Sequence, residues 1–177
     1  EGEAVIVEPA VAGDVPEIVA LEEAFDTPWS EDSWRAELHG DDRLVLAARR
    51  RSDGVLIGAA SFRVVDDVAE LNRIVVAPQQ RRLGLARVML VAGMQWAIGK
   101  GAARILLEVD HANDAAIALY RGYGFRQIAV RPDYYGPGAD ALILERGLEG
   151  VDADSVGMWE MEARDTPGAS DARRAVR

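Results

Sequence analysis

The pattern of apolar and polar residues predicts one strand and two helices before the main part of a sheet. Ala4 to Val7 alternates weakly, as expected of a short strand. Apolar residues then recur at helical spacing from Val15 to Phe25, and Asp14 stands where such a helix would begin. A second short helix is predicted to start after Ser30, whose hydroxyl can cap it, and to end at about Leu38.

Three consecutive strands are predicted next, and together they form a meander. Their ranges are Leu44 to Ala48, Val55 to Val65 and Val68 to Val76. Asp53-Gly54 lies between the first two strands, and both residues are expected to adopt the positive φ angles of a tight hairpin turn.

The second half of the chain alternates helix and strand. The predicted elements are a helix from Leu85 to Ile98, a strand from Ala103 to Val109, a helix from Asn113-Asp114 to about Gly122, and strands at Phe125 to Val130 and about Ala139 to Glu145. The strand, helix and strand over residues 71–109 imply a parallel or splayed pair. The predicted class is therefore a mixed α/β (α+β) fold with a mostly antiparallel sheet, and not a regular doubly wound fold.

Composition changes near residue 149 and divides the chain into a domain and a tail. The 177 residues are 49% hydrophobic, which fits one globular domain, placed at residues 1–148. Residues 149–177 are dominated by Gly, Asp, Ala, Ser and Pro without a persistent period, so we expect a flexible tail there.

Several classes of protein are disfavoured by composition and charge. No stretch approaches the roughly 18 to 20 uninterrupted apolar residues of a membrane span, and the acidic start carries no signal-peptide pattern. The absence of cysteine excludes disulfides, thiolate metal sites and a cysteine nucleophile. We therefore expect a cytoplasmic protein without a metal. A net charge of −10 argues against general affinity for nucleic acid and favours a basic peptide or protein partner.

The segment that joins the third meander strand to the following helix carries the first chemical signal. A glycine-bearing turn that opens a helix presents unpaired backbone N–H groups at the positive end of the helix dipole. Gly84 allows close approach of an anion, small Ala86 follows it, and Arg81, Arg82 and Arg87 supply positive charge. The segment predicts a loop that holds a diphosphate; the alternative is a surface turn with solvated arginines.

Further along the chain, other segments accompany this loop in a recognisable order. They are Thr27-Pro28-Trp29-Ser30-Glu31, Ile74 to Pro78 with Arg81 to Ala86, Leu107-Glu108-Val109, Asn113 to Tyr120 with Gly124-Phe125, and Tyr134-Tyr135. Together they resemble the GCN-five-related N-acetyltransferase (GNAT) superfamily, and within it the bacterial ribosomal-protein-alanine N-acetyltransferases called RimI. The resemblance covers about residues 4–147. Asp110, followed by His111, stands where this family usually has an arginine after its Glu-Val pair.

The resemblance implies the GNAT fold and acetyl-CoA as co-substrate. The residues that would hold acetyl-CoA are Ile74, Val75 and Val76 through their backbone, Arg81, Arg82, Leu83, Gly84, Leu85, Ala86 and Arg87 around the diphosphate, and Asn113 at the pantetheine arm. For Asn113 a helix cap is the alternative role, and it is compatible with the first.

The chemistry of acetyl transfer assigns two further roles. An acceptor amine must lose a proton, and Glu108 is the candidate base because a lone carboxylate in an apolar strand is costly without a partner or solvent. Glu70 and His111 are the rivals. Tyr120, in the matching family position, is the candidate proton donor to the departing CoA thiolate, or else a packed aromatic residue. Without cysteine, direct attack in a ternary complex is expected.

Three aromatic residues are expected to shape the acceptor groove, namely Trp29, Tyr134 and Tyr135. The resulting hypothesis is acetylation of a protein N-terminus, with the N-terminal alanine of a small-subunit ribosomal protein as the family's acceptor. A small-molecule amine or lysine as acceptor, and a non-catalytic acyl-CoA-binding module, are the alternatives.

Overall fold

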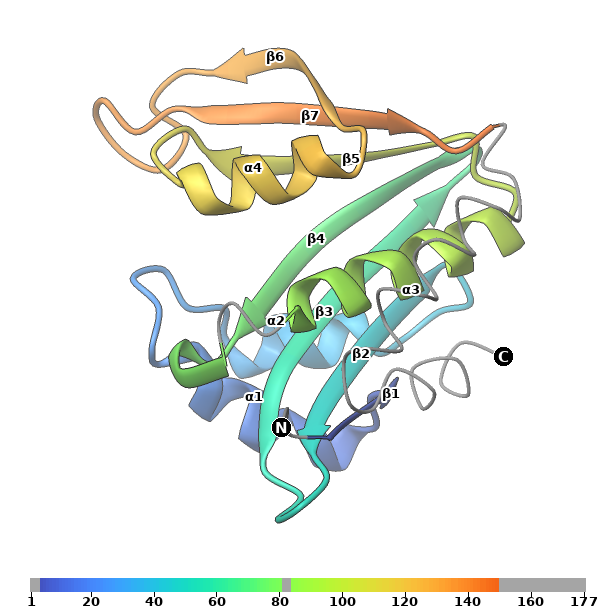
Figure 1. Ribbon diagram of the computed structural model, residues 1–177, viewed down its shortest axis with the longest axis vertical. Coiled ribbons are helices and arrows are strands. Elements are labelled where there is room, and N and C mark those ends of the chain that lie inside the picture. The colour runs from blue at the N-terminus through green and yellow to red at the C-terminus, as the bar shows by residue number, and fades with distance from the viewer. Residues whose placement is uncertain (1–3, 81–83, 150–177) are drawn as a thin grey trace.

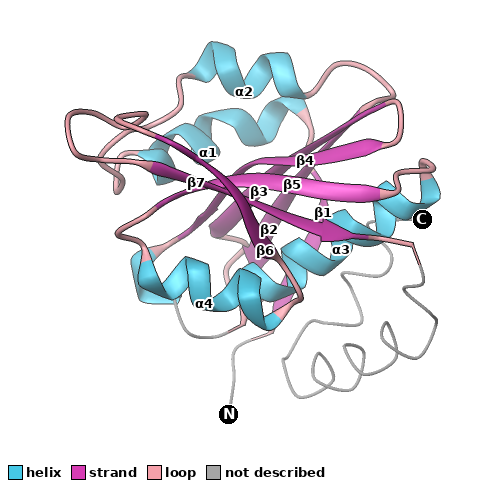
Figure 2. Cartoon of the chain, turned by 90° about the horizontal axis from the view of Figure 1, so that it is seen from above, coloured by secondary structure: helices cyan, strands magenta, loops and turns pink. Residues whose placement is uncertain are grey.

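The computed structural model describes residues 4–80 and 84–149, and within them the chain forms a mixed sheet covered on both faces by helices. The strands are β1 (Val5–Pro9), β2 (Arg43–Arg50), β3 (Leu56–Val65), β4 (Val68–Val76), β5 (Arg104–Asp110), β6 (Arg126–Arg131) and β7 (Ala141–Gly147). The helices are α1 (Val15–Glu22), α2 (Glu31–Glu37), α3 (Leu85–Gly99) and α4 (Asp114–Gly122), with short 3-10 turns at Ala12–Asp14 and Pro78–Gln80. Figure 2 shows α1 and α2 on one face of the sheet and α3 and α4 on the other.

The described sheet has seven strands in the order β1-β2-β3-β4-β5-β7-β6. All neighbouring pairs are antiparallel except β4 and β5, which run parallel because α3 connects them as a crossover. The predicted mixed α/β class, with its meander and one parallel pair, is therefore confirmed.

The turn between β2 and β3 differs from the prediction. Gly54 has a positive φ of 72°, but Asp53 does not. The prediction of a two-residue turn with two positive φ angles was therefore wrong. Instead, the Asp53 carboxylate accepts from the Val55 N–H at 3.1 Å and pairs with Arg50 at 2.9 Å. A longer connection held by that carboxylate replaces the tight turn.

Two helix starts agree with the sequence. The Ser30 hydroxyl accepts from the Ser33 N–H at 3.1 Å at the start of α2. The Asn113 side-chain oxygen accepts from the Ala116 N–H at 3.2 Å at the start of α4. Each cap satisfies one of the N–H groups that a helix start leaves without an intrahelical partner.

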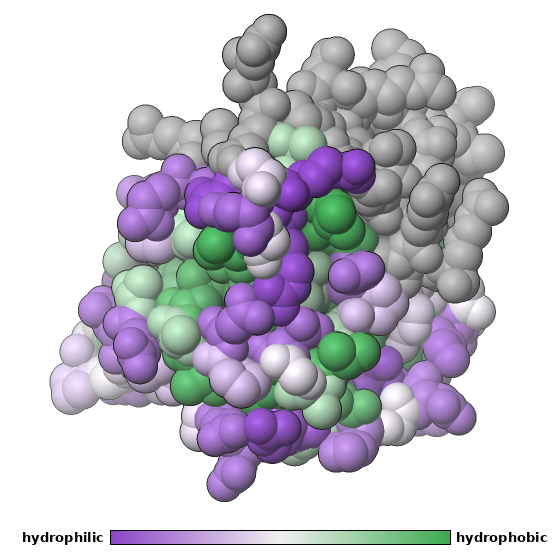
Figure 3. All heavy atoms as spheres, turned by 90° about the horizontal axis from the view of Figure 1, so that it is seen from below, coloured by the Kyte–Doolittle hydropathy of each residue, from purple (hydrophilic) through white to green (hydrophobic). Residues whose placement is uncertain are grey.

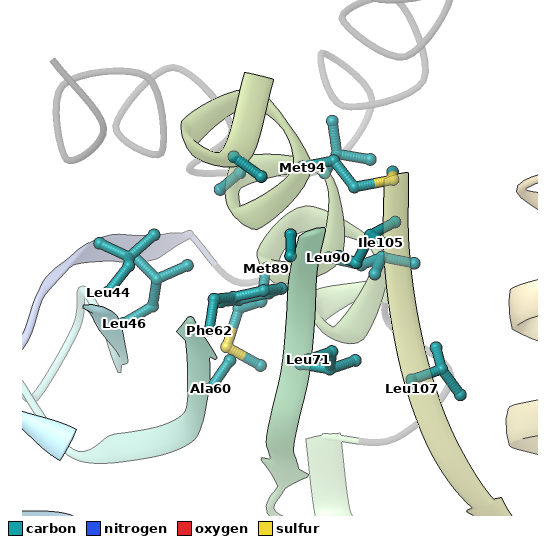
Figure 4. Packing of buried hydrophobic residues seen from close by; sticks show 14 of the residues in the cluster. Leu44, Leu46, Ala60, Phe62, Leu71, Met89, Leu90, Met94, Ile105 and Leu107 are labelled. Carbon is teal, nitrogen blue, oxygen red and sulfur yellow. The ribbon is translucent and has the colours of Figure 1, made fainter. Parts of the chain in front are cut away.

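The larger hydrophobic core lies between the sheet and α3. Phe62 of β3 and Met89 and Leu90 of α3 are fully buried and meet there, together with Ile105 of β5 (Figure 4). A Cβ on Gly93 would come within 2.1 Å of the Phe62 ring. Only glycine therefore lets α3 lie this close to β3, and the position of its N-terminus depends on that contact.

A smaller core lies between α1, α2 and the opposite face of the sheet. Trp34 and Ile18 are completely buried there, beside Ala59 of β3 and Val75 of β4. The face seen in Figure 3 shows groups of hydrophobic residues between hydrophilic ones.

Among the described residues, no helix is long and apolar enough to cross a membrane. Of the predicted tail, residues 150–177 lie outside the described ranges, so the division into domain and tail stays a prediction.

Candidate active site

The parallel pair β4–β5 opens part of the way along its length. Its ladder runs from Val68 opposite Arg104 to Leu71 opposite Leu107, and no described residue of β4 beyond Leu71 pairs with β5. Figure 1 shows the two strands diverging, with the α1–α2 loop and the β6–β7 loop on the side where they separate. The split exposes strand-edge backbone groups, which is what a bound acyl chain needs for hydrogen bonds.

A bulge in β4 prepares the split. Opposite Ser61 lies Arg73 and opposite Phe62 lies Leu71, so β4 carries one extra residue, Asn72. As a result Leu71 packs in the α3 core, whereas Val75 packs in the α1/α2 core. Without the extra residue, Val75 would lie on the same face of the sheet as Leu71, which faces α3. The bulge places it on the opposite face.

The residues predicted to contact the acyl group lie along this open edge. Val75 is buried, and Ile74 and Val76 are partly buried against the α3 core. On its other edge β4 remains paired with β3, with Val76 opposite Gly58. The backbone between Ile74 and Val76 is thus rigidly held on one side and unpaired with β5 on the other.

The predicted diphosphate loop is described only from Gly84 onward; Arg81, Arg82 and Leu83 lie outside the described residues. Gly84 is the N-cap of α3, with φ 78°, and among the described residues no side chain is seen to cap the helix there. Leu85 is buried, Ala86 is half-buried and Arg87 is exposed. The first turn of a helix of 15 residues therefore presents N–H groups without a side-chain cap, an arrangement that suits an anion.

The start of α3 is pressed close to the sheet. A Cβ on Gly58 would lie 3.0 Å from Leu85 and 3.2 Å from Met89. Because β3 carries a glycine at this point, the N-terminus of α3 reaches the end of β4 closely. The uncapped helix start and the open strand edge are thus placed next to each other in the fold.

Tyr120 and Asn113 are both carried by α4. Tyr120 is buried, with its ring 5.7 Å from that of Phe125. Burial, and to a smaller extent the neighbouring Tyr135, raises the pKa of the Tyr120 hydroxyl. The cap at Asn113 uses the side-chain oxygen, which leaves the amide nitrogen as a donor for another partner.

Glu108 lies on β5 just past the last residue paired with β4. Its side chain is 29% exposed, so solvent reaches it, and Arg131 Nη1 of β6 lies 2.9 Å from its Oε1 atom. The side chain of Tyr134 interacts with Glu108 as well, and Glu108 is the main reason that the pKa of Tyr134 is raised. Both conditions that make a carboxylate tolerable in an apolar strand, solvent and a partner, are met.

Arg131 is a site residue that the sequence reasoning missed. Besides its ion pair with Glu108, its guanidinium lies 5.7 Å from the centre of the Tyr134 ring. The only signal for it was proximity, since Arg131 precedes the tyrosine pair by a few residues.

The two tyrosines stand at the entrance of the site. Tyr134 is 51% and Tyr135 39% exposed, and their rings meet edge to face at 5.0 Å. Burial raises the pKa of Tyr135 to about 12, and the charge of Glu108 adds to the rise. Glu108 therefore raises the pKa of both Tyr134 and Tyr135, and Tyr135 in turn raises the pKa of Tyr120.

The two rival bases have other surroundings. His111 Nδ1 accepts from the Asp140 backbone N–H at 3.1 Å, so the ring helps to hold the β6–β7 loop. Glu70 is exposed on β4, opposite Arg63 of β3. Neither influences the pKa of Tyr134 or Tyr135, whereas Glu108 influences both.

On the opposite wall, the α1–α2 loop carries Trp29. Its ring is half-buried and lies 5.1 Å from that of Trp34, in the smaller core. Arg73 lies 5.9 Å from the Trp29 ring centre. Burial raises the pKa of Tyr135, and the charge of Arg73 lowers it by a smaller amount. Trp29 and Tyr135, which come from distant segments, thus both interact with Arg73.

A sheet split at its parallel pair, with a helix start directed at the split, is the architecture of acyl-transferring enzymes of one class, the N-acetyltransferases. A model of the Acetyltransferase (GNAT) family matches residues 16–125 of the chain. The chain therefore belongs to the GNAT family of acetyltransferases.

Two relatives that are named as N-acetyltransferases support the same conclusion. The chain is 34% identical over 126 residues to N-alpha-acetyltransferase RimI of Mycobacterium tuberculosis, a match covering 68% of this chain and 77% of the relative. It is 33% identical over 123 residues to the [ribosomal protein bS18]-alanine N-acetyltransferase of Escherichia coli, covering 69% and 81%. A third relative is the uncharacterized protein ML0378 of Mycobacterium leprae, which is 33% identical over 154 residues, and the match covers 82% of this chain but only 42% of the relative.

Solved structures agree with these relatives. The crystal structure of the ribosomal-protein-S18-alanine N-acetyltransferase from Escherichia coli superposes with a TM-score of 0.75 at 29% identity, covering 84% of this chain and 96% of that one. The NatC complex bound to Gag peptide and CoA shares the fold, with a TM-score of 0.74 at 20% identity and coverage of 81% and 98%. The predicted resemblance to GNAT enzymes of the RimI type is confirmed.

Proposed function

We propose that this protein transfers the acetyl group of acetyl-CoA to the N-terminal α-amine of a protein, with an N-terminal alanine of a small-subunit ribosomal protein as the expected acceptor. One observation carries the proposal: the Glu108 carboxylate lies where β4 and β5 separate, partly exposed and flanked by the two tyrosines. The names of the relatives from Mycobacterium tuberculosis and Escherichia coli supply the acceptor class.

The residues present fit acetyl-CoA as co-substrate. The start of α3 at Gly84 lacks a side-chain cap, and a diphosphate would satisfy its N–H groups. The backbone of Ile74 to Val76 would bind the acyl end along the open strand edge, and the Asn113 amide nitrogen would donate to the pantetheine arm. Bound there, acetyl-CoA supplies an acetyl group activated as a thioester.

An α-amine suits a carboxylate base better than a lysine side chain does. The α-ammonium group loses its proton at a pKa of about 7.7 to 8.0, against about 10.4 for lysine. A single carboxylate reached by solvent can take that proton directly or through a water molecule. Glu108 is such a group, because 29% of its side chain is exposed.

The proton and bond changes balance with two side chains. The acceptor nitrogen forms a bond to the acetyl carbon while the carbon–sulfur bond of the thioester breaks. The attacking nitrogen is the neutral amine, formed when its ammonium proton passes to Glu108 and on to solvent. Glu108 then receives the proton that the nitrogen loses as the amide forms, Tyr120 donates a proton to the departing sulfur, and a proton from solvent restores the Tyr120 hydroxyl. The Tyr120 hydroxyl carries its proton at neutral pH, and burial, which raises its pKa, keeps it in that form.

Arg131 and Tyr134 would orient the base rather than react. Arg131 pairs with the Glu108 carboxylate at 2.9 Å and Tyr134 interacts with it, both from the β6–β7 side, and the carboxylate stays partly exposed. An acceptor N-terminus would enter between the tyrosine pair and Trp29. The net charge of −10 favours a basic protein segment beyond that entrance, as on a ribosomal protein in the cytoplasm.

Mass spectrometry of peptides incubated with acetyl-CoA tests the proposal. Peptides that begin with Ala, Ser or Met and also contain one internal lysine are the substrates. We expect the acetyl group on the N-terminus, with Ala as the best first residue. Acetylation of a polyamine or an aminoglycoside without any peptide product would overturn the proposal in favour of a small-molecule acceptor. Binding of CoA without transfer to any amine would indicate a non-catalytic module.

A further inference from the structure

A buried carboxylate that the proposed chemistry does not use lies beneath the α1–α2 loop. Glu22 is the last residue of α1 and is 0% exposed. An ionised carboxylate in such a place is unfavourable unless charged and hydrogen-bonding partners surround it. The partners of Glu22 therefore indicate its role.

Arg73 of β4 is the charged partner of Glu22. Its Nε and Nη2 atoms donate to Glu22 Oε1 at 3.2 and 2.9 Å. Nη2 also donates to the carbonyl oxygen of Thr27 at 3.2 Å, and the second carboxylate oxygen of Glu22 accepts from the Trp29 backbone N–H. One ion pair thus connects two points of the α1–α2 loop, residues 23–30, to a strand of the sheet.

The aromatic side chains of the same loop pack on the guanidinium. The Cζ atom of Arg73 lies 5.9 Å from the ring centres of both Phe25 and Trp29, within the range of cation–π attraction. Trp29 also contacts the ring of Trp34, which is completely buried. The orientation of Trp29 is therefore set from two sides, by Arg73 and by the smaller core.

The β4 bulge places Arg73 where the acceptor is expected. Arg73 shares the sheet face of Val75, two residues away, and follows Leu71, the last residue of β4 that pairs with β5. The charge of Arg73 lowers the pKa of Tyr135, which lies on the other side of the split. Arg73 consequently lies between the loop that carries Trp29 and the loop that carries Tyr135.

We propose that Arg73 is a positioning residue that fixes the α1–α2 loop, and through it Trp29, as the acceptor-binding wall of the site. Both oxygens of Glu22 are used in this network, so Glu22 holds Arg73 and is not a base. The inference deepens the proposed function and rests on it for the identity of the acceptor. Acceptor binding should therefore depend on the Glu22–Arg73 pair, and acetyl-CoA binding should not.

Four variants test this role. Arg73→Met removes the guanidinium, and Arg73→Lys keeps the charge but loses the planar fork that reaches Glu22 and Thr27 together. The double variant Glu22→Gln/Arg73→Met leaves no unpaired buried charge, so it keeps the test valid if Arg73→Met fails to fold. Arg104→Met is the matched control, because it removes another guanidinium of the sheet, paired with Glu145 at 2.9 Å.

Steady-state kinetics and limited proteolysis are the two measurements. For Arg73→Met and the double variant, we expect the KM for an alanine-initiated peptide to rise by about tenfold, since small displacements of positioning groups have large effects. The KM for acetyl-CoA should stay at its wild-type value, and Arg73→Lys should fall in between. A protease specific for Asp should cut the loop at Asp26 faster in both variants than in wild type or Arg104→Met.

Each outcome decides the inference. A rise in acceptor KM together with faster cleavage at Asp26 supports it, provided that Arg104→Met shows neither. Wild-type acceptor KM and wild-type cleavage in the Arg73 variants overturn it, as does an equal rise in both KM values. If wild-type protein acetylates no peptide, the proposed function fails. Cleavage at Asp26 then still decides whether Arg73 fixes the loop.

Discussion

The two sides of the split between β4 and β5 are built in different ways. On the donor side, nearly all groups that would hold acetyl-CoA belong to one continuous segment, from Ile74 to Arg87, and act through their backbone. On the acceptor side, the groups that we propose to bind the acceptor or to move its proton are side chains from separate elements. Trp29 comes from the α1–α2 loop, Glu108 from β5, and Arg131 from β6.

This difference separates what local sequence determines from what the fold assembles. A strand, a glycine turn and a helix start specify an anion site by their order alone. The acceptor side depends on ion pairs between distant residues, such as Glu22 with Arg73, 51 positions apart. Substitutions on the donor side should therefore change acetyl-CoA binding, and those on the acceptor side should change the acceptor or the rate.

The largest effect is expected from Glu108→Gln. The amide cannot accept the proton of the amine, so kcat should fall by about 10²- to 10⁴-fold, with CoA affinity unchanged. Rates with an alanine-initiated peptide and calorimetric titration with CoA measure both. Glu70→Gln, at the exposed rival position, should leave the rate near that of wild type; the opposite ranking would assign the base to β4.

Tyr120→Phe should lower kcat by about 10- to 10²-fold, because the departing thiolate loses its proton donor. The same variant has a signature in stability. Since burial raises the pKa of Tyr120, the unfolded chain ionises first as pH rises above about 10. In that window wild type should lose stability more steeply than Tyr120→Phe, by up to about 1.4 kcal/mol per pH unit.

Urea unfolding at intervals above pH 9 measures this difference. Equal slopes for both proteins would show that the Tyr120 hydroxyl is not held in its protonated form by the fold. An unchanged kcat in Tyr120→Phe would leave Tyr120 as a packed aromatic residue beside Phe125.

Arg131→Gln should reduce kcat by about tenfold, since Glu108 loses the charged group that orients it. Arg126→Gln is the control on the same strand; its guanidinium is 3.8 Å from Glu145 and exposed. Equal kcat values for the two variants would remove Arg131 from the site.

The smallest effect is expected on the donor side, at Asn113. Asn113→Ala loses the cap of α4 and should destabilise the protein by about 1 kcal/mol. Asn113→Ser keeps a cap but lacks the amide donor, so it should raise the KM for acetyl-CoA with little loss of stability. If Asn113→Ser matches wild type in KM, the residue is a helix cap only.

The sequence was most informative where local chemistry decides the structure. The caps at Ser30 and Asn113 follow from one side chain and one backbone group, and both are present. The turn at Asp53 was predicted wrongly, because its carboxylate bonds to the Val55 N–H and Arg50 and so permits a longer connection. Turn type depends on such contacts, which spacing alone does not reveal.

The site could be predicted only in its contiguous parts. Glu108 stood out as a charge in an apolar strand, but its partner Arg131 had no local signal beyond its proximity to the tyrosine pair. The position of Arg73 depends on the bulge at Asn72, which turns its side chain to the acceptor face. Arg81, Arg82 and Leu83 lie outside the described residues, and their role in holding the diphosphate stays a prediction.

The most direct test of the central claim compares two peptides of the same sequence. One begins with a free alanine, the other has that amine blocked, and both contain one lysine. With wild-type protein and acetyl-CoA, we predict rapid release of CoA with the free peptide and almost none with the blocked one. Glu108→Gln should abolish the difference by removing the fast reaction. Equal release with both peptides would show transfer to lysine and contradict the assignment of this site to N-terminal amines.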